Sequence, residues 1–304
     1  MTKSKSLFDL FYSKLLSERV REKSEVMIIS VAIISFIIHL LLVVLANLNI
    51  LHLNDYSKLF NNPIAAIYTP FSFILIYEVY LLVYYLPKST TIYIGKQYEI
   101  ITLIVIRNLF KDLANLEFTA DWFNVKYDLQ FTYDLIATIL LFFLIYVFYR
   151  LNERKDNGQP KESNLSLEIV KFIRMKNIIA MCLIPVFFIL AIYGLTKWVH
   201  GSFFSISNIV YSIKDVNTIF FNEFFTVLIL TDVLLLLISF LYTDKFNTVI
   251  RNSGFIISTI LIKLSFGTAG LLNTILIVVA VLFGVVILLI HNQYDKIGLR
   301  NSQL

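Results

Sequence analysis

Long apolar stretches alternate with short polar segments along the whole chain. Eight stretches can be delimited, at residues 26–46, 64–86, 98–113, 131–149, 177–199, 220–242, 255–270 and 271–290. Most reach the roughly 20 residues that a helix needs to cross a bilayer core of about 30 Å, while the third and the seventh are shorter and contain charges. The pattern predicts an all-α integral membrane protein with eight transmembrane helices, the last two joined by a tight hairpin at residues 267–270.

The composition points to the same class of protein. Of the 304 residues, 58% are hydrophobic and only 15% are charged, which excludes an ordinary soluble domain. A lipid bilayer is therefore the expected partner, and nucleic acid is not. Many Ile, Asn, Lys, Phe and Tyr with few Gly and Pro are typical of AT-rich bacterial genomes, so we expect a multi-pass protein of a bacterial inner membrane.

The distribution of basic residues predicts the orientation of the helices, because Lys and Arg are retained on the cytoplasmic side of a membrane. Nineteen of the 26 Lys and Arg fall in one set of alternate loops and termini. The other set holds only five, which are Lys58, Lys111, Lys126, Lys197 and Lys214. Both termini are therefore expected in the cytoplasm.

One hydrophilic linker, residues 153–166, divides the chain into two halves with four apolar stretches each. It predicts two four-helix membrane repeats, residues 1–152 and 167–304. Because each half crosses the membrane an even number of times, both start on the same side, as parallel repeats do. Each half opens with an amphipathic segment, residues 6–23 and 165–176, which either lies in the headgroup layer or caps the cytoplasmic end of the bundle.

Four ionisable residues lie inside the apolar stretches, namely Glu78, Arg107, Asp232 and Lys263. A charged side chain costs on the order of 3 kcal/mol or more at the centre of a membrane helix, so four of them at matching places are a functional signal. When the halves are aligned, acid matches acid and base matches base. Hydroxyl residues match as well, Ser72 with Thr226 and Thr102 with Ser258. The correspondence predicts an internal duplication.

We expect an ion pair between each acid and the base of the next helix, because residue counts place both at similar depth. Two interpretations stay open: the pairs either fix helix register as neutralised clamps, or they line a polar cavity through which an ion or a proton passes. Glu99 lies eight residues before Arg107 on nearly the same helix face and extends this polar stripe. His39, a lone intramembrane histidine, either relays protons or bonds to a backbone carbonyl.

The sequence carries no recognisable motif for catalysis, metal binding or cofactor binding, and its single Cys182 excludes an intramolecular disulfide. We therefore expect a protein that is not an enzyme and holds no cofactor or metal. The favoured function is a channel or transporter for a small ion, with the two charge pairs at its core. The alternative is a non-conducting membrane scaffold or effector subunit that docks a cytoplasmic protein partner. Whether the chain forms a homo-oligomer stays open.

Overall fold

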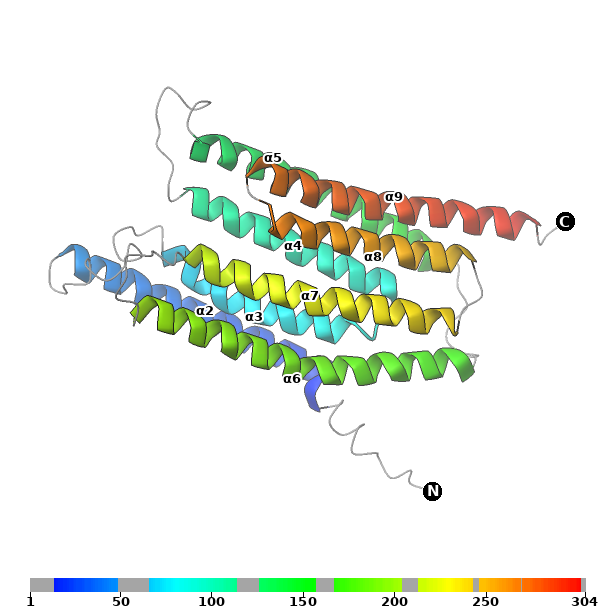
Figure 1. Cartoon of the computed structure of the whole chain (residues 1–304), viewed down its shortest axis with the longest axis horizontal. Coiled ribbons are helices and arrows are strands. Elements are labelled where there is room, and N and C mark those ends of the chain that lie inside the picture. Colours follow the sequence, from blue (N-terminus) through cyan, green and yellow to red (C-terminus); the bar gives the residue numbers. More distant parts are fainter. Residues whose placement is uncertain are drawn as a thin grey trace, which may run out of the picture.

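The computed structural model describes residues 14–48, 66–113, 126–156, 167–203, 213–242, 246–268 and 270–301. Within these residues the long elements are all helices and there is no strand (Figure 1). The helices are α2 (Glu18–Asn47), α3 (Tyr68–Tyr85), α4 (Thr90–Leu113), α5 (Lys126–Asp156), α6 (Leu167–Phe203), α7 (Ile213–Phe240), α8 (Phe246–Phe266) and α9 (Leu271–Asn301). The predicted all-helical fold class is confirmed.

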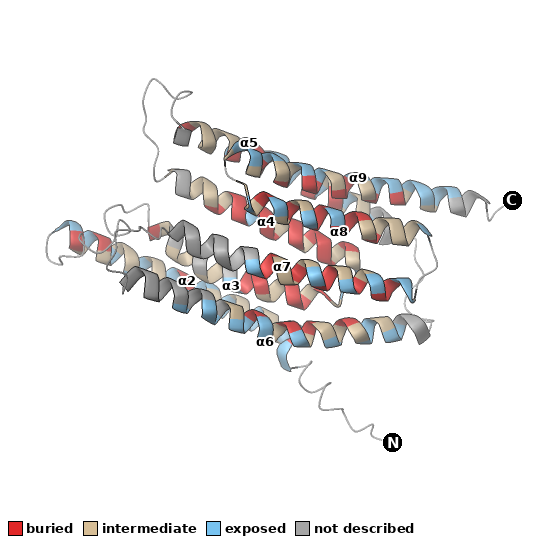
Figure 2. Ribbon diagram, in the orientation of Figure 1, coloured by how far each residue is buried: buried red, intermediate tan, exposed pale blue. Residues whose placement is uncertain are grey.

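The helices form two stacked rows, one from each half of the chain. In the first row α2, α3, α4 and α5 contact one another in chain order, and in the second row α6, α7, α8 and α9 do the same. The rows meet where α5 packs on α9, α4 packs on α8 and α9, and α3 packs on α6 (Figure 1). Buried residues gather where the rows face each other, most densely along α4 (Figure 2).

Six helices in the described part of the chain are long and apolar enough to cross a membrane: α2, α5, α6, α7, α8 and α9. Helix α3 has a shorter apolar part, Thr69–Tyr85, and α4 does not reach the same limits. Eight crossings, the orientation and the parallel repeat therefore stay predictions. The six helices are sufficient to define a multi-pass membrane protein.

The outer surface of the bundle is apolar, as a lipid environment requires. On α2 the side chains of Ile33, Ile34, Ile37 and Ile38 are each 53% to 57% exposed. Exposed positions also run along the outer faces of the other helices (Figure 2). A continuous band of exposed isoleucine would aggregate in water. In a bilayer the same band contacts acyl chains.

Several helices begin earlier than the apolar pattern indicates. Helix α4 begins at Thr90, eight residues before the predicted span, and α8 begins at Phe246, nine residues before its own. The added turns contain polar side chains that bond inside the bundle, such as Gln97 on α4 and Asn252 on α8. An apolar criterion misses these turns because their polar groups are satisfied by protein instead of water.

Within the described residues the second amphipathic segment is continuous with α6, whereas the first is interrupted: Lys14 and Leu15 are helical, and Ser17 caps the start of α2. Glu18–Lys23 makes the first turns of α2, and Leu167–Lys176 makes the first turns of the 37-residue α6. Residues 6–13 and 165–166 lie outside the described part. At the linker, α5 continues to Asp156, and residues 157–166 also lie outside that part.

The hairpin between α8 and α9 is as tight as the sequence predicts. Helix α8 ends at Phe266, α9 begins at Leu271, and the two helices contact each other. Gly270 has a φ of +68°, in the left-handed region that favours glycine. The short turn holds the two helices side by side, and the register of α9 against α4 and α5 depends on it.

The predicted orientation can be tested with cysteines placed between the spans. We expect Lys161→Cys to react with a membrane-impermeant maleimide from the cytoplasmic side and Lys126→Cys to react from the opposite side, because the linker is cytoplasmic and an odd number of crossings separates the two positions. The background is Cys182→Ser, since native Cys182 is exposed on α6. Labelling of both positions from one side would contradict the arrangement of four spans before the linker.

Candidate functional site

Glu78 on α3 and Arg107 on α4 form a buried ion pair. Their side chains are 4% and 5% exposed, and Nη2 of Arg107 lies 3.8 Å from Oε2 of Glu78. Helices α3 and α4 run in opposite directions, and side chains tilt toward the N-terminus of their own helix, so these two converge. The distance exceeds that of a hydrogen bond, and the attraction is therefore mainly Coulombic. The two opposite charges neutralise each other inside the first row.

The structure does not bring Asp232 and Lys263 together, although the sequence predicts them as a pair. Within the described residues, Oδ2 of Asp232 accepts a hydrogen bond from Nε2 of Gln97 at 3.1 Å. The ammonium of Lys263 donates instead to Oγ1 of Thr226 at 2.6 Å. The acid and the base of the second half thus have separate partners.

The early starts of α4 and α8 explain part of this difference. The predicted depths assumed helices that begin near residues 98 and 255, whereas the helices begin at Thr90 and Phe246. At 1.5 Å per residue, Arg107 lies about 12 Å and Lys263 about 14 Å further from the start of its helix than the prediction assumed. The predicted depth of each base was therefore too small by this amount.

Side-chain length explains the rest. Glu78 and Arg107 both have long side chains, and their charged ends come within 3.8 Å of each other. Asp232 is one methylene shorter than a glutamate. Thr226 precedes Asp232 by six residues on α7 and lies closer to the level of Lys263, so it receives the ammonium.

Asp232 belongs to a polar network that joins the two rows. Gln97 of α4 donates to Asp232 of α7, and Oε1 of Gln97 accepts from Oγ1 of Thr259 of α8 at 2.9 Å. All three residues are less than 5% exposed. The amide of one half of the chain thus bridges two helices of the other half, and both of its polar atoms are used.

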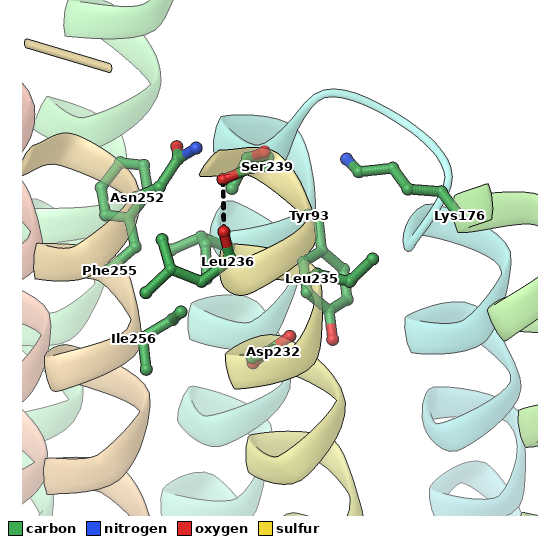
Figure 3. Close-up of a pocket in the computed structure, with 11 residues that line it drawn as sticks. Tyr93, Lys176, Asp232, Leu235, Leu236, Ser239, Asn252, Phe255 and Ile256 are labelled. Atoms are coloured by element: carbon green, nitrogen blue, oxygen red, sulfur yellow. Dashed lines mark hydrogen bonds between the residues drawn. The ribbon is translucent and has the colours of Figure 1, made fainter. Parts of the chain in front are cut away.

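A small cavity lies beside Asp232, at the end of the bundle where α4 and α8 begin and α7 ends (Figure 3). Its volume is about 30 Å³, which is room for one or two water molecules. Its polar lining comes from four helices and includes Tyr93, Lys176, Asp232, Ser239 and Asn252.

Two polar groups of this cavity are notable for their burial. The hydroxyl of Tyr93 points toward Asp232 (Figure 3) and is buried away from solvent. Lys176 is 5% exposed, and its Nζ donates to the backbone carbonyl of Lys88 at 2.9 Å. A buried phenol, a buried ammonium and a buried carboxylate therefore share one water-sized space.

The remaining predicted residues lie elsewhere. Nδ1 of His39 lies 2.5 Å from Oγ1 of Thr69, between α2 and α3. Glu99 is partly exposed, pairs with Lys96 at 2.7 Å and accepts from the hydroxyl of Tyr149 on α5. It therefore contacts α5 and not the Glu78 pair. The side chain of Ser72 lies outside the described residues.

Thr102 and Ser258 both contact Tyr98. Oγ1 of Thr102 donates to the backbone carbonyl of Tyr98 at 2.9 Å. The hydroxyl oxygens of Tyr98 and Ser258 lie 2.8 Å apart, and Ser258 also donates to the carbonyl of Ala280 at 2.6 Å. The ring of Tyr98 rests against Gly284 of α9, where a Cβ would lie 2.7 Å from its Cζ. This contact sets the distance between the rows.

Sequence reasoning missed Gln97, Tyr93 and Lys176. Gln97 and Tyr93 precede the predicted third span, but they are four residues apart and therefore share a helix face. Two polar residues at this spacing next to an apolar stretch are the sequence pattern that could have identified both as site residues. Lys176 was assigned to an amphipathic segment, and nothing in its sequence context shows that it enters the bundle.

Comparisons with protein-family models, with curated proteins and with solved structures find no match for this chain. The fold and the site alone therefore define its class. It is a helical, multi-pass membrane protein with a buried polar network between the two halves of its bundle.

The Glu78–Arg107 pair can be tested by single and double substitution. Arg107→Ala leaves Glu78 buried without this cation, and breaking a buried pair typically costs about 3 to 5 kcal/mol of stability. Glu78→Ala combined with Arg107→Ala removes both charges and should recover much of the loss. Thermal unfolding in detergent measures all three variants. Additive losses would show that the two side chains do not depend on each other.

The contact between Tyr98 and Gly284 gives a second stability prediction. Gly284→Ala should cost about 1 to 3 kcal/mol, because the new methyl overlaps the phenol. Tyr98→Phe should cost about 1 kcal/mol for its lost hydrogen bond. The double variant should lose less than the sum, since Tyr98→Phe removes the atom closest to the methyl. Gly267→Ala is the control: its Cβ would meet nothing closer than 3.5 Å. Equal losses for the two glycines would contradict the close contact.

Proposed function

We propose that this chain is a channel or transporter that moves a small ion across a membrane, and that the ion is held at Asp232 during passage. The observation that carries the proposal is the setting of this carboxylate. It is 4% exposed, lies in a membrane-length helix, borders a water-sized cavity, and has no Lys or Arg within ion-pair distance among the described residues.

Neutral hydrogen bonds alone do not offset the negative charge of a carboxylate in this setting, so the carboxylate needs a positive charge close to it. Gln97 supplies one neutral donor, which compensates only part of the cost of removing the charge from water. A bound proton or cation would supply the remainder. Ionisable residues inside membrane helices mark ion and proton pathways for this reason.

The position of Asp232 between the two rows supports the same proposal. Transporters built from repeats bind their substrates where the repeats meet. Here Asp232 comes from the second half of the chain and Gln97 from the first. A relative movement of the rows would change the surroundings of Asp232 directly.

The Glu78–Arg107 pair has a different role in this proposal. The two charges already neutralise each other within one row, so they fix α3 against α4 and bind no ion. Lys263, bonded to Thr226, holds α8 against α7 in a comparable way. Of the two interpretations that the sequence leaves open, the clamp suits the first pair and ion passage suits Asp232.

The cavity beside Asp232 has room for one or two water molecules, which is too small for an open pore. The proposal therefore describes a closed state, in which passage requires the rows to move.

We place the protein in a bacterial inner membrane on its composition, with the lipid bilayer as its partner. The alternative is a non-conducting scaffold or effector subunit that docks a cytoplasmic protein. A measurement of ion flux distinguishes this alternative from the proposed transport.

Asp232→Asn tests the proposal. The full chain in proteoliposomes should carry an ion current, and the variant should lose it while remaining folded, because an amide oxygen can still accept from Gln97. The matched control is Asp134→Asn on α5. Asp134 is also buried and accepts from Thr274 at 2.6 Å, but it lies outside the cavity. Full current in Asp232→Asn would contradict its role, and no current in the wild type would favour the scaffold.

A further inference from the structure

We propose that the ion held at Asp232 is a proton and that Lys176 excludes metal cations from the site. The inference rests on the proposed function and adds the identity of the ion. Lys176 and Asp232 line the same cavity from different helices, α6 and α7 (Figure 3). The ammonium lies at the end of the bundle, and the carboxylate lies deeper.

The residue spacing on α7 gives the depth. Ser239 lines the cavity close to the end of α7, and Asp232 precedes it by seven residues, which is about 10 Å along the helix. Lys176 is held near the entrance by its bond to the carbonyl of Lys88, in the connection between α3 and α4. An ion that enters from this end passes Lys176 before it reaches Asp232.

A second cation lies next to one residue of the lining. Arg251 of α8 donates from Nε and Nη2 to the side-chain oxygen of Asn252, and Asn252 lines the cavity. The titratable groups that line the cavity with Asp232 are Tyr93 from α4 and Lys176 from α6, whereas Arg251 lies beside the lining residue Asn252 and also contacts Nε2 of His291 on α9. Lys176 is the cation of this lining, so a metal cation meets repulsion where it enters.

The oxygen atoms near Asp232 are also too few for a metal ion. Sodium, potassium and calcium need several oxygen ligands at once. Gln97 presents its NH₂ group to Asp232, because its own oxygen accepts from Thr259. The carboxylate and the hydroxyl of Tyr93 are the nearest cavity oxygens (Figure 3). A proton needs a single acceptor and a water or hydroxyl that hands it on, and this cavity supplies both.

Separate measurements of proton flux and of Na⁺ and K⁺ flux test the proposal. The full chain in proteoliposomes should acidify the lumen under an imposed membrane potential, read with a pH-sensitive dye, and should not carry Na⁺ or K⁺. Lys176→Met removes the entrance charge at similar size and should raise Na⁺ flux relative to proton flux by about tenfold. Lys176→Arg should keep the wild-type selectivity. Lys171→Met, at an exposed position of the same helix, is the matched control.

A spectroscopic measurement does not depend on the folding of these variants. The C=O stretch of a protonated carboxylic acid is followed by infrared difference spectroscopy on the wild type in nanodiscs, and the band that Asp232→Asn removes is assigned to Asp232. We expect this band to titrate with pH and to be the same with and without Na⁺.

The outcomes separate the two proposals. Proton flux without Na⁺ or K⁺ flux, together with a band unaffected by Na⁺, supports proton binding. Na⁺ or K⁺ flux in the wild type, loss of the band on adding Na⁺, or no band at any pH would overturn it while leaving ion transport intact. Absence of flux for every ion would overturn transport itself, and the proton with it.

Discussion

The bilayer core offers polar groups no water, and the architecture of this protein follows from that constraint. Backbone groups are satisfied within helices, which leaves the side chains to find partners across the bundle. In the described residues they do so in two ways. Some partners lie on the neighbouring helix of the same row, as with Glu78 and Arg107 or Lys263 and Thr226. Others cross between the rows, as with Gln97 and Asp232.

Partners within one row and partners between rows have different mechanical consequences. A bond inside a row fixes two consecutive helices and does not change when the rows move. A bond between rows breaks or rearranges with any such movement. Asp232 is attached to the first row by one neutral hydrogen bond from Gln97. The surroundings of Asp232 therefore depend on how the two rows are placed against each other.

Much of the fold could be read from the sequence, because lipid exposure produces long apolar stretches. Each of the eight stretches coincides with one helix, and the hairpin at Gly270 is where glycine and the pattern place it. The polar ends of α4 and α8 could not be delimited in this way. Thr90 and Phe246 begin helices whose first turns look like loops until their partners are known.

The site was only partly predictable for the same reason. Glu78 and Arg107 stand out as charges in apolar helices, and their pairing follows from consecutive, antiparallel helices. The partner of Asp232 comes from the other half of the chain, 135 residues away in sequence. No local pattern encodes such a contact. The cavity that Lys176 and Asp232 share depends on how the rows stack, which hydrophobicity alone does not specify.

The ring of Tyr98 against Gly284 gives the two rows a fulcrum. A flat ring on bare backbone cannot be compressed, so the rows cannot approach further at this point, but they can tilt about it. Gln97 is adjacent to this pivot, whereas Leu113 at the far end of α4 is 15 residues away. A small rotation about this point would therefore move the end of the bundle beside Asp232 through a short arc and the opposite end through a longer one, in the manner of a lever with unequal arms.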